Sequence, residues 1–155
     1  MESTGKRGKR EIGKGPQDAA QPHKGAPHAR PEKSSQFRGF ISVQMGIDLV
    51  KRVYCLTTEG DFHRDFGLKD QIRRASVSVP TNIAEGFELS SRKEYLKFLN
   101  IAKGSAGEVR SLLRVAWEVG YIEASQYAEL RDATMKLSAY LFNHIKSIRN
   151  APPSS

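Results

Sequence analysis

Residues 71–86, QIRRASVSVPTNIAEG, form the segment that decides the fold of this chain. Around them, apolar side chains recur every three or four positions, which draws one stripe along a helix. The stripe consists of Leu68, Ile72, Ala75, Val79 and Ile83. The spacing predicts a helix from about Leu68 to Glu85. Gly86 should end it, because glycine accepts the left-handed conformation of a helix C-terminus, and Pro80 should kink it.

An earlier helix is expected from about Phe40 to Thr57. Its apolar face should carry large side chains, with Lys51 and Arg52 turned outward. The members of this face are Phe40, Val43, Ile47, Val50 and Tyr54. Gly60 and Asp61 then interrupt the pattern, and two aromatic residues in the loop 59–67 should cover the end of the core.

A third helix begins at Ser91, because Glu94 three residues later completes a capping box, and it ends at Gly120. Its core stripe alternates steps of three and four: Tyr95, Phe98, Ala102, Ser105, Val109, Leu112, Ala116 and Val119. A second apolar flank widens the stripe beyond one seam: Leu99, Ala106, Leu113 and Trp117. So wide an apolar arc predicts a second packing partner, either inside the bundle or in another subunit. Leu99, Leu113 and Trp117 are therefore candidate residues of an oligomer interface.

A fourth helix should span about Ala124 to Ile148, with an inward face of Tyr127, Leu130, Thr134, Leu137, Leu141 and Ile145. Four helices with short connections predict an all-α fold, an antiparallel up-and-down four-helix bundle. The bundle domain should cover residues 37–149. Residues 1–36 and 150–155 should be disordered tails, because they offer almost no apolar surface to bury.

Composition favours a cytoplasmic protein. The net charge is +8, and residues 1–36 and 37–155 contribute +4 each, from eight and seventeen basic against four and thirteen acidic residues. An anionic partner fits this charge. The single cysteine, Cys55, fits a reducing compartment and should be a buried, inert thiol. No apolar run reaches the roughly twenty residues of a membrane span, so no membrane contact is expected.

Several motifs resemble the four-helix bundle family of 23S rRNA intervening-sequence proteins. They are residues 71–78 (QIRRASVS), 82–87 (NIAEGF), 98–108 (FLNIAKGSAGE) and 120–122 (GYI), within a likeness that covers about residues 37–149. Members are encoded in bacterial ribosomal RNA genes or elsewhere and have no established enzymatic activity. The fold is similar to that of the accessory variability determinant proteins of diversity-generating retroelements, which form pentameric barrels and bind nucleic acid and a reverse transcriptase. The resemblance implies a homopentamer with RNA or DNA contact.

The polar residues of the central helix have two interpretations. In the structural one, a hairpin turning near Glu88 places Arg73 and Arg74 beside Lys103 and Gly104, with Glu108 about one turn further along. One of the arginines then pairs with Glu108, because buried charges need partners. Asn82 and Glu85 would tie the helix end to its neighbours. In the functional one, a basic surface binds phosphates through Lys51, Arg52, Lys69, Arg73, Arg74, Lys103, Arg110 and Arg114.

No catalytic residue, metal site or cofactor is expected. Ser105 lies on a core stripe in the middle of a helix, and the histidines show no metal-ligand spacing. Sequence therefore favours a non-enzymatic oligomer that contacts RNA or DNA. The alternative is a structural oligomer, or one that binds another protein, whose charges serve only solubility. The two differ in the salt dependence of any nucleic-acid binding.

Overall fold

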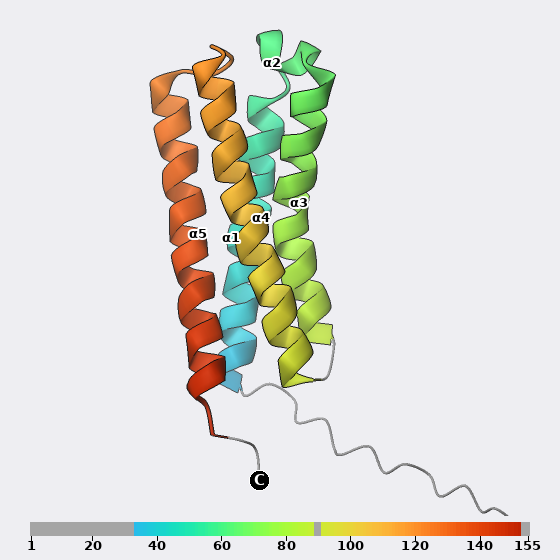
Figure 1. The fold of residues 1–155 in the computed structure, drawn as a ribbon, viewed down its shortest axis with the longest axis vertical. Helices are drawn as coiled ribbons and strands as arrows, with labels where there is room; N and C mark the ends of the chain where they lie inside the picture. The colour runs from blue at the N-terminus through green and yellow to red at the C-terminus, as the bar shows by residue number, and fades with distance from the viewer. Residues whose placement is uncertain (1–32, 89–90, 153–155) are drawn as a thin grey trace, which may run out of the picture.

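The computed structural model describes residues 33–88 and 91–152, which form the antiparallel four-helix bundle that the sequence predicts. Its long helices are α1 (Lys33–Leu56), α3 (Phe66–Glu88), α4 (Arg92–Glu118) and α5 (Ala124–Asn150), and a short helix α2 (Gly60–Arg64) caps one end (Figure 1). Helices α1 and α4 lie diagonally opposite, because each packs against both α3 and α5. None of the described helices is long and apolar enough to cross a bilayer.

The first helix begins earlier than expected, at Lys33, so residues 33–36 are helical and do not belong to a tail. The remainder of the predicted N-terminal tail, residues 1–32, lies outside the described residues. At the other end, Asn150 still belongs to α5.

The predicted inward face of α1 is wrong for its largest side chains, although Val43 packs against the core as expected. The structure buries the small stripe Gly39, Ser42, Gly46, Leu49 and Val53. Phe40 and Tyr54 are instead 61% and 41% exposed. Both stripes have the same three- and four-residue spacing, so periodicity cannot choose between them. The close approach of the neighbouring helices selects the stripe with small residues, because a Cβ at Gly39 would lie 2.8 Å from the Tyr95 hydroxyl oxygen.

Helix α3 continues through Pro80 and Gly86 to Glu88. The prediction that Gly86 ends this helix is therefore wrong. Gly86 instead permits close contact with α4, since a Cβ there would lie 2.7 Å from Phe98 Cβ. The register that follows brings the hydroxyl oxygens of Ser78 and Ser105 within 2.8 Å.

Helix α4 is the most thoroughly buried of the four. Its side chains from Tyr95 to Ala116 form most of the predicted stripe, although Phe98 is only half-buried and Val119 is 56% exposed. The Ser91 hydroxyl accepts the Glu94 N–H, as the capping-box pattern predicts. Gly120 follows the helix with a φ of 82°, a left-handed conformation that suits glycine.

The loops at the α2 end are joined by Asp65. One carboxylate oxygen accepts the Leu68 N–H at the start of α3 (3.0 Å), and the other accepts the Tyr121 hydroxyl from the α4–α5 loop (2.9 Å). The Phe62 and Tyr121 rings lie 5.5 Å apart. The loop aromatic Phe62 therefore covers the core end as predicted, whereas Phe66 is 72% exposed.

Candidate nucleic-acid interface

The eight predicted phosphate-binding residues do not form one surface. Arg110 and Arg114 line a groove between α4 and α5, while Arg73 and Arg74 line another beside Tyr54. Arg52 lines a third, between α1 and α5, and Lys51, Lys69 and Lys103 line none of the three. The structure thus divides the predicted surface among separate faces of the bundle.

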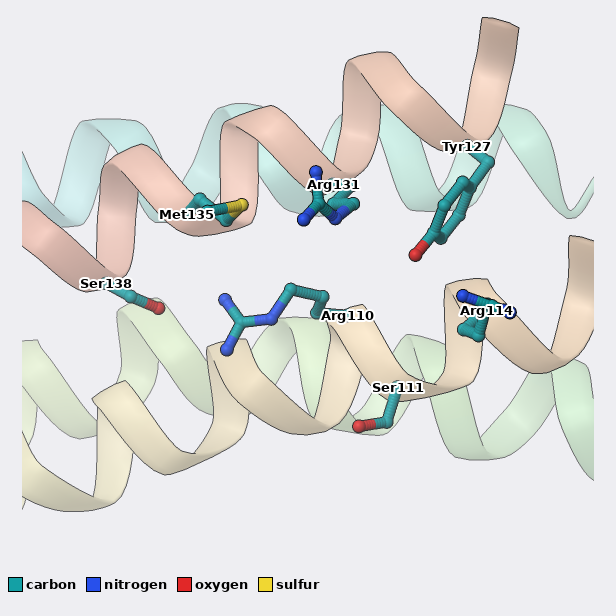
Figure 2. A pocket seen from close by; sticks show the side chains of 7 residues that line it. All are labelled: Arg110, Ser111, Arg114, Tyr127, Arg131, Met135 and Ser138. Carbon is teal, nitrogen blue, oxygen red and sulfur yellow. The ribbon is translucent and has the colours of Figure 1, made fainter. Parts of the chain in front are cut away.

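Of the three grooves, the one between α4 and α5 is lined by the most basic residues. Three arginines from two helices, Arg110, Arg114 and Arg131, line it together with Ser111, Tyr127, Met135 and Ser138 (Figure 2). The groove has a volume of about 660 Å³, and no carboxylate belongs to its lining. Arg131 belongs to this groove because α5 runs antiparallel to α4, so the first turns of α5 lie opposite the last turns of α4.

The charges in this groove are only partly compensated. Arg114 Nε donates to Glu118 Oε1 at 2.7 Å, an exposed pair that contributes little. This hydrogen bond contributes most to raising the pKa of Arg114 above its ordinary value. Within residues 33–88 and 91–152, neither Arg110 nor Arg131 takes part in an ion pair. Three guanidinium groups share one groove, and an anion bound between them would relieve their mutual repulsion.

Aromatic rings accompany the basic residues of this face. Lys103 Nζ lies 5.1 Å from the centroid of the Phe142 ring, which ties α4 to α5. At the other end, the Arg114 guanidinium lies 5.1 Å from the Trp117 ring, and Trp117 stacks on Tyr127 at 4.7 Å between centroids. The face between α4 and α5 therefore alternates cations with flat apolar groups.

The predicted network of Arg73 and Arg74 with Glu108 is wrong. Arg73 turns toward α1, where its Nε donates to the Thr57 hydroxyl at 2.8 Å and its guanidinium lies 4.3 Å from the Tyr54 ring. Arg74 is exposed and pairs with Asp70 on its own helix, with Nε and Oδ2 3.1 Å apart. Adjacent residues on a helix are about 100° apart, so the two arginines serve different faces.

The other members of that predicted network are also separate. Asn82 Nδ2 donates to the Ser78 carbonyl at 2.7 Å and contacts the Ser78 hydroxyl at 2.9 Å, which keeps it within α3. Glu85 and Glu108 are exposed, and neither joins an ion pair in the described part of the chain. The register of α3 against α4 differs from the one expected. Helix α3 continues to Glu88 and α4 begins at Arg92, and Ser78 lies opposite Ser105.

The remaining basic candidates stand apart. Lys51 and Arg52 are exposed on α1, as predicted, and Lys69 Nζ lies 4.6 Å from the centroid of the exposed Phe66 ring. Arg52 lines its groove together with two glutamates, Glu59 and Glu129, which weakens its attraction for an anion. Cys55 lines the same groove and is exposed, so the expected buried thiol is wrong.

The predicted oligomer interface on α4 is wrong for two of its three residues. Leu99 and Leu113 are fully buried in the core of the bundle, and Trp117 is partly buried against it. The second partner of the wide α4 arc is therefore the bundle's own α5. Four exposed large apolar side chains lie instead along the outside of α1: Phe37, Phe40, Ile47 and Tyr54, which we call the outer α1 stripe.

A buried polar cluster lies near the start of α1. The Ser35 hydroxyl and His144 Nε2 are 3.0 Å apart, and the His144 and Tyr95 rings meet edge to face at 5.6 Å. Burial lowers the pKa of His144 to about 4 and raises the pKa of Tyr95 to about 12. His144 Nδ1 and the Tyr95 hydroxyl have no hydrogen-bond partner among the described residues. Residues 33–88 and 91–152 hold no cluster of potential metal ligands.

Sequence reasoning missed Arg131 and Phe142 as members of the basic face. The signal lay in the antiparallel turn near Gly120, which predicts that positions equally far from the turn lie opposite one another. By that rule Arg114 faces Arg131 and Lys103 faces Phe142, because both pairs of residue numbers sum to 245.

Comparison with known proteins gives a family and a fold. The family model described as 23S rRNA-intervening sequence protein matches residues 38–143, more than half of the chain. The fold is similar to the crystal structure of a protein of unknown function from the S23 ribosomal protein family of Bacteroides thetaiotaomicron, with a TM-score of 0.66 and 23% identity. That similarity covers 70% of this chain and 98% of the other. No curated protein matches the chain.

Proposed function

Because the chain belongs to the 23S rRNA-intervening sequence protein family, we propose that it is a non-enzymatic accessory protein that binds RNA or DNA and acts as a homo-oligomer. The single observation that carries this proposal is the α4–α5 groove. Three arginines line it, and Arg110 and Arg131 are without an ion-pair partner among the described residues. The planar donor fork of arginine matches a phosphate group.

Nucleic acid suits this groove better than a small anion does. Lys103 and Phe142 extend the basic face along both helices beyond the lining residues of the groove. An extended polyanion can contact the whole row, whereas a single phosphate would meet only part of it. Contacts of this kind are to the backbone and carry little sequence information.

Self-association is supported by the outer α1 stripe. Its members are spaced by three and seven residues, the pattern by which one helix meets another. The stripe extends from Phe37 to Tyr54, about 25 Å of helix at roughly 1.5 Å per residue. We propose that a second copy of the chain covers it. The number of copies proposed, five, comes from the resemblance to the accessory variability determinant proteins.

The absence of catalysis is also part of the proposal. Ser35 and His144 form a Ser–His contact, but His144 is fully buried and lines none of the described grooves. Ser105 is turned toward Ser78 in the α3–α4 interface. Both serines therefore have structural partners.

A salt series tests the nucleic-acid part of the proposal. Fluorescence anisotropy with a labelled RNA of mixed sequence should give log Kd rising steeply with log salt, with a slope of about 2 for three single-strand phosphate contacts. The double variant Arg110→Gln/Arg131→Gln should weaken binding strongly. The matched control Arg64→Gln/Lys136→Gln removes two exposed charges outside the groove and should bind almost normally.

The alternative, a purely structural or protein-binding oligomer, is favoured by the outer α1 stripe alone. If the purified chain binds no RNA or DNA at 50 mM salt, the alternative replaces our proposal. Sedimentation velocity tests self-association separately: Phe40→Glu/Ile47→Glu should give folded monomers from a larger wild-type species. A wild-type monomer would contradict self-association.

A further inference from the structure

We propose that the α4–α5 groove binds single-stranded nucleic acid, with the arginines on its phosphates and the exposed apolar side chains beneath its bases. This inference rests on the nucleic-acid function proposed above and specifies the class of ligand. A double helix would offer the same phosphates to the arginines. It keeps its base faces stacked inside, however, so it cannot use the apolar side chains of the same face.

The basic residues are spaced as a row. Lys103, Arg110 and Arg114 occupy one flank of α4, and the eleven steps from the first to the last span about 16 Å at roughly 1.5 Å per residue. Arg131 joins the row from α5. A row of this length is suited to several successive phosphates of an extended strand.

Apolar groups lie between and beside these cations. Phe142 is 52% exposed and Met135 is 44% exposed, both on the same side of α5 as Arg131. In Figure 2, Met135 lies on the groove beside Arg131, and the Tyr127 ring projects from α5 toward α4. An exposed aromatic ring such as Phe142 among cations is typical of single-strand binding, because any base can stack on it, and Met135 adds apolar surface beside it.

Hydroxyl groups add donors without adding charge. Ser111 and Ser138 line the groove (Figure 2). The Ser138 hydroxyl oxygen is buried and has no hydrogen-bond partner among the described residues. Ser111 is exposed and can donate directly to a phosphate oxygen, whereas the Ser138 side chain would first have to rotate toward the groove.

The Trp117 and Tyr127 rings limit the row at one end. They stack on each other with 4.7 Å between ring centroids, Arg114 covers Trp117, and both side chains are partly buried. At the other end, Lys103 covers one face of the Phe142 ring in the same way, but Phe142 remains 52% exposed. The open base-stacking position is therefore Phe142, with Met135 as the next one along α5.

The test compares three probes on the full chain: a labelled single-stranded oligo(dT) of twelve nucleotides, the same sequence as a duplex, and inorganic polyphosphate as competitor. We expect tighter binding of the single strand than of the duplex. Phe142→Ala should weaken single-strand binding about five-fold or more, the usual loss for one base-stacking residue, and leave duplex binding unchanged. The matched control Val115→Ala removes an exposed apolar side chain of α4 outside the groove and should change neither.

Each outcome separates the two proposals. If the duplex binds as tightly as the single strand, or Phe142→Ala weakens both equally or neither, the single-strand inference is wrong. The nucleic-acid function then stands as long as Arg110→Gln/Arg131→Gln still loses binding. Polyphosphate of equal charge could displace oligo(dT) equally well from the wild type and from Phe142→Ala. That result would identify a general anion site and would contradict the single-strand inference. No binding of any probe at 50 mM salt would overturn both.

Discussion

Pro80 of α3 packs directly against Gly46 of α1. A Cβ atom at position 46 would lie 3.1 Å from Pro80 Cβ and 3.2 Å from the Pro80 backbone nitrogen. Proline and glycine both disfavour a helix interior, yet together they allow the two helix axes to come close. This contact explains why α1 turns its small stripe inward.

Gly46→Ala should lower the melting temperature. Alanine gains about 1 kcal/mol of helix propensity, but the clash involves backbone and ring atoms that cannot rotate away, and overpacking costs about 1–3 kcal/mol. Gly104→Ala is the matched control, because a Cβ there meets nothing within 4 Å. It should stabilise the protein by up to about 1 kcal/mol. Thermal unfolding of both variants checks the pair, and a stabilised Gly46→Ala would contradict the packing.

Stability should depend on the protonation of His144. Its folded pKa of about 4 is below the ordinary value of 6.5, so folding favours the neutral ring. The stabilisation is fully present above pH 6.5 and is lost as the pH falls toward 4. At 1.36 kcal/mol per unit, the shift corresponds to about 3 kcal/mol. Urea unfolding of wild type and His144→Gln between pH 7.5 and 4 measures the difference.

The difference in free energy of unfolding between these two proteins should shrink as the pH falls through this window. His63→Gln is the control, because it removes an exposed histidine on α2 and leaves the buried His144 in place. A His144→Gln profile parallel to wild type would show that His144 does not titrate on unfolding.

Asp65 and Tyr121 should be energetically coupled. The carboxylate caps α3 through Leu68 and also accepts the Tyr121 hydroxyl, and these hydrogen bonds lower the pKa of Asp65. Tyr121→Phe should therefore raise the pKa of Asp65, measured by NMR titration of its carboxyl carbon. Asp65→Ala should reduce stability more than Tyr121→Phe, because it also removes the cap. Additive effects in the double variant would exclude the coupling.

Leu113→Glu should prevent folding. Leu113 is fully buried, and an unpaired carboxylate in the core is strongly destabilising. Val115→Glu, two residues along the same helix, is the control, because Val115 is 46% exposed and should tolerate the charge. Circular dichroism separates the two, and a folded Leu113→Glu protein that only dissociates would restore the interface first predicted on α4.

The amino-acid sequence by itself determined the number of long helices, the buried faces of α4 and α5, the capping box at Ser91 and the turn at Gly120. These features follow from local rules, because spacing along one helix and the conformation of one glycine need no information from the rest of the chain.

Only the tertiary structure decided which stripe of α1 is buried, why Gly86 lies inside α3, and which basic residues meet. The two α1 stripes have the same spacing, and the contact with Pro80 selects the smaller one. Arg131 joins Arg110 and Arg114 through the antiparallel register of α4 and α5. These features depend on distances between helices, and the periodicity of a single helix carries no information about those distances.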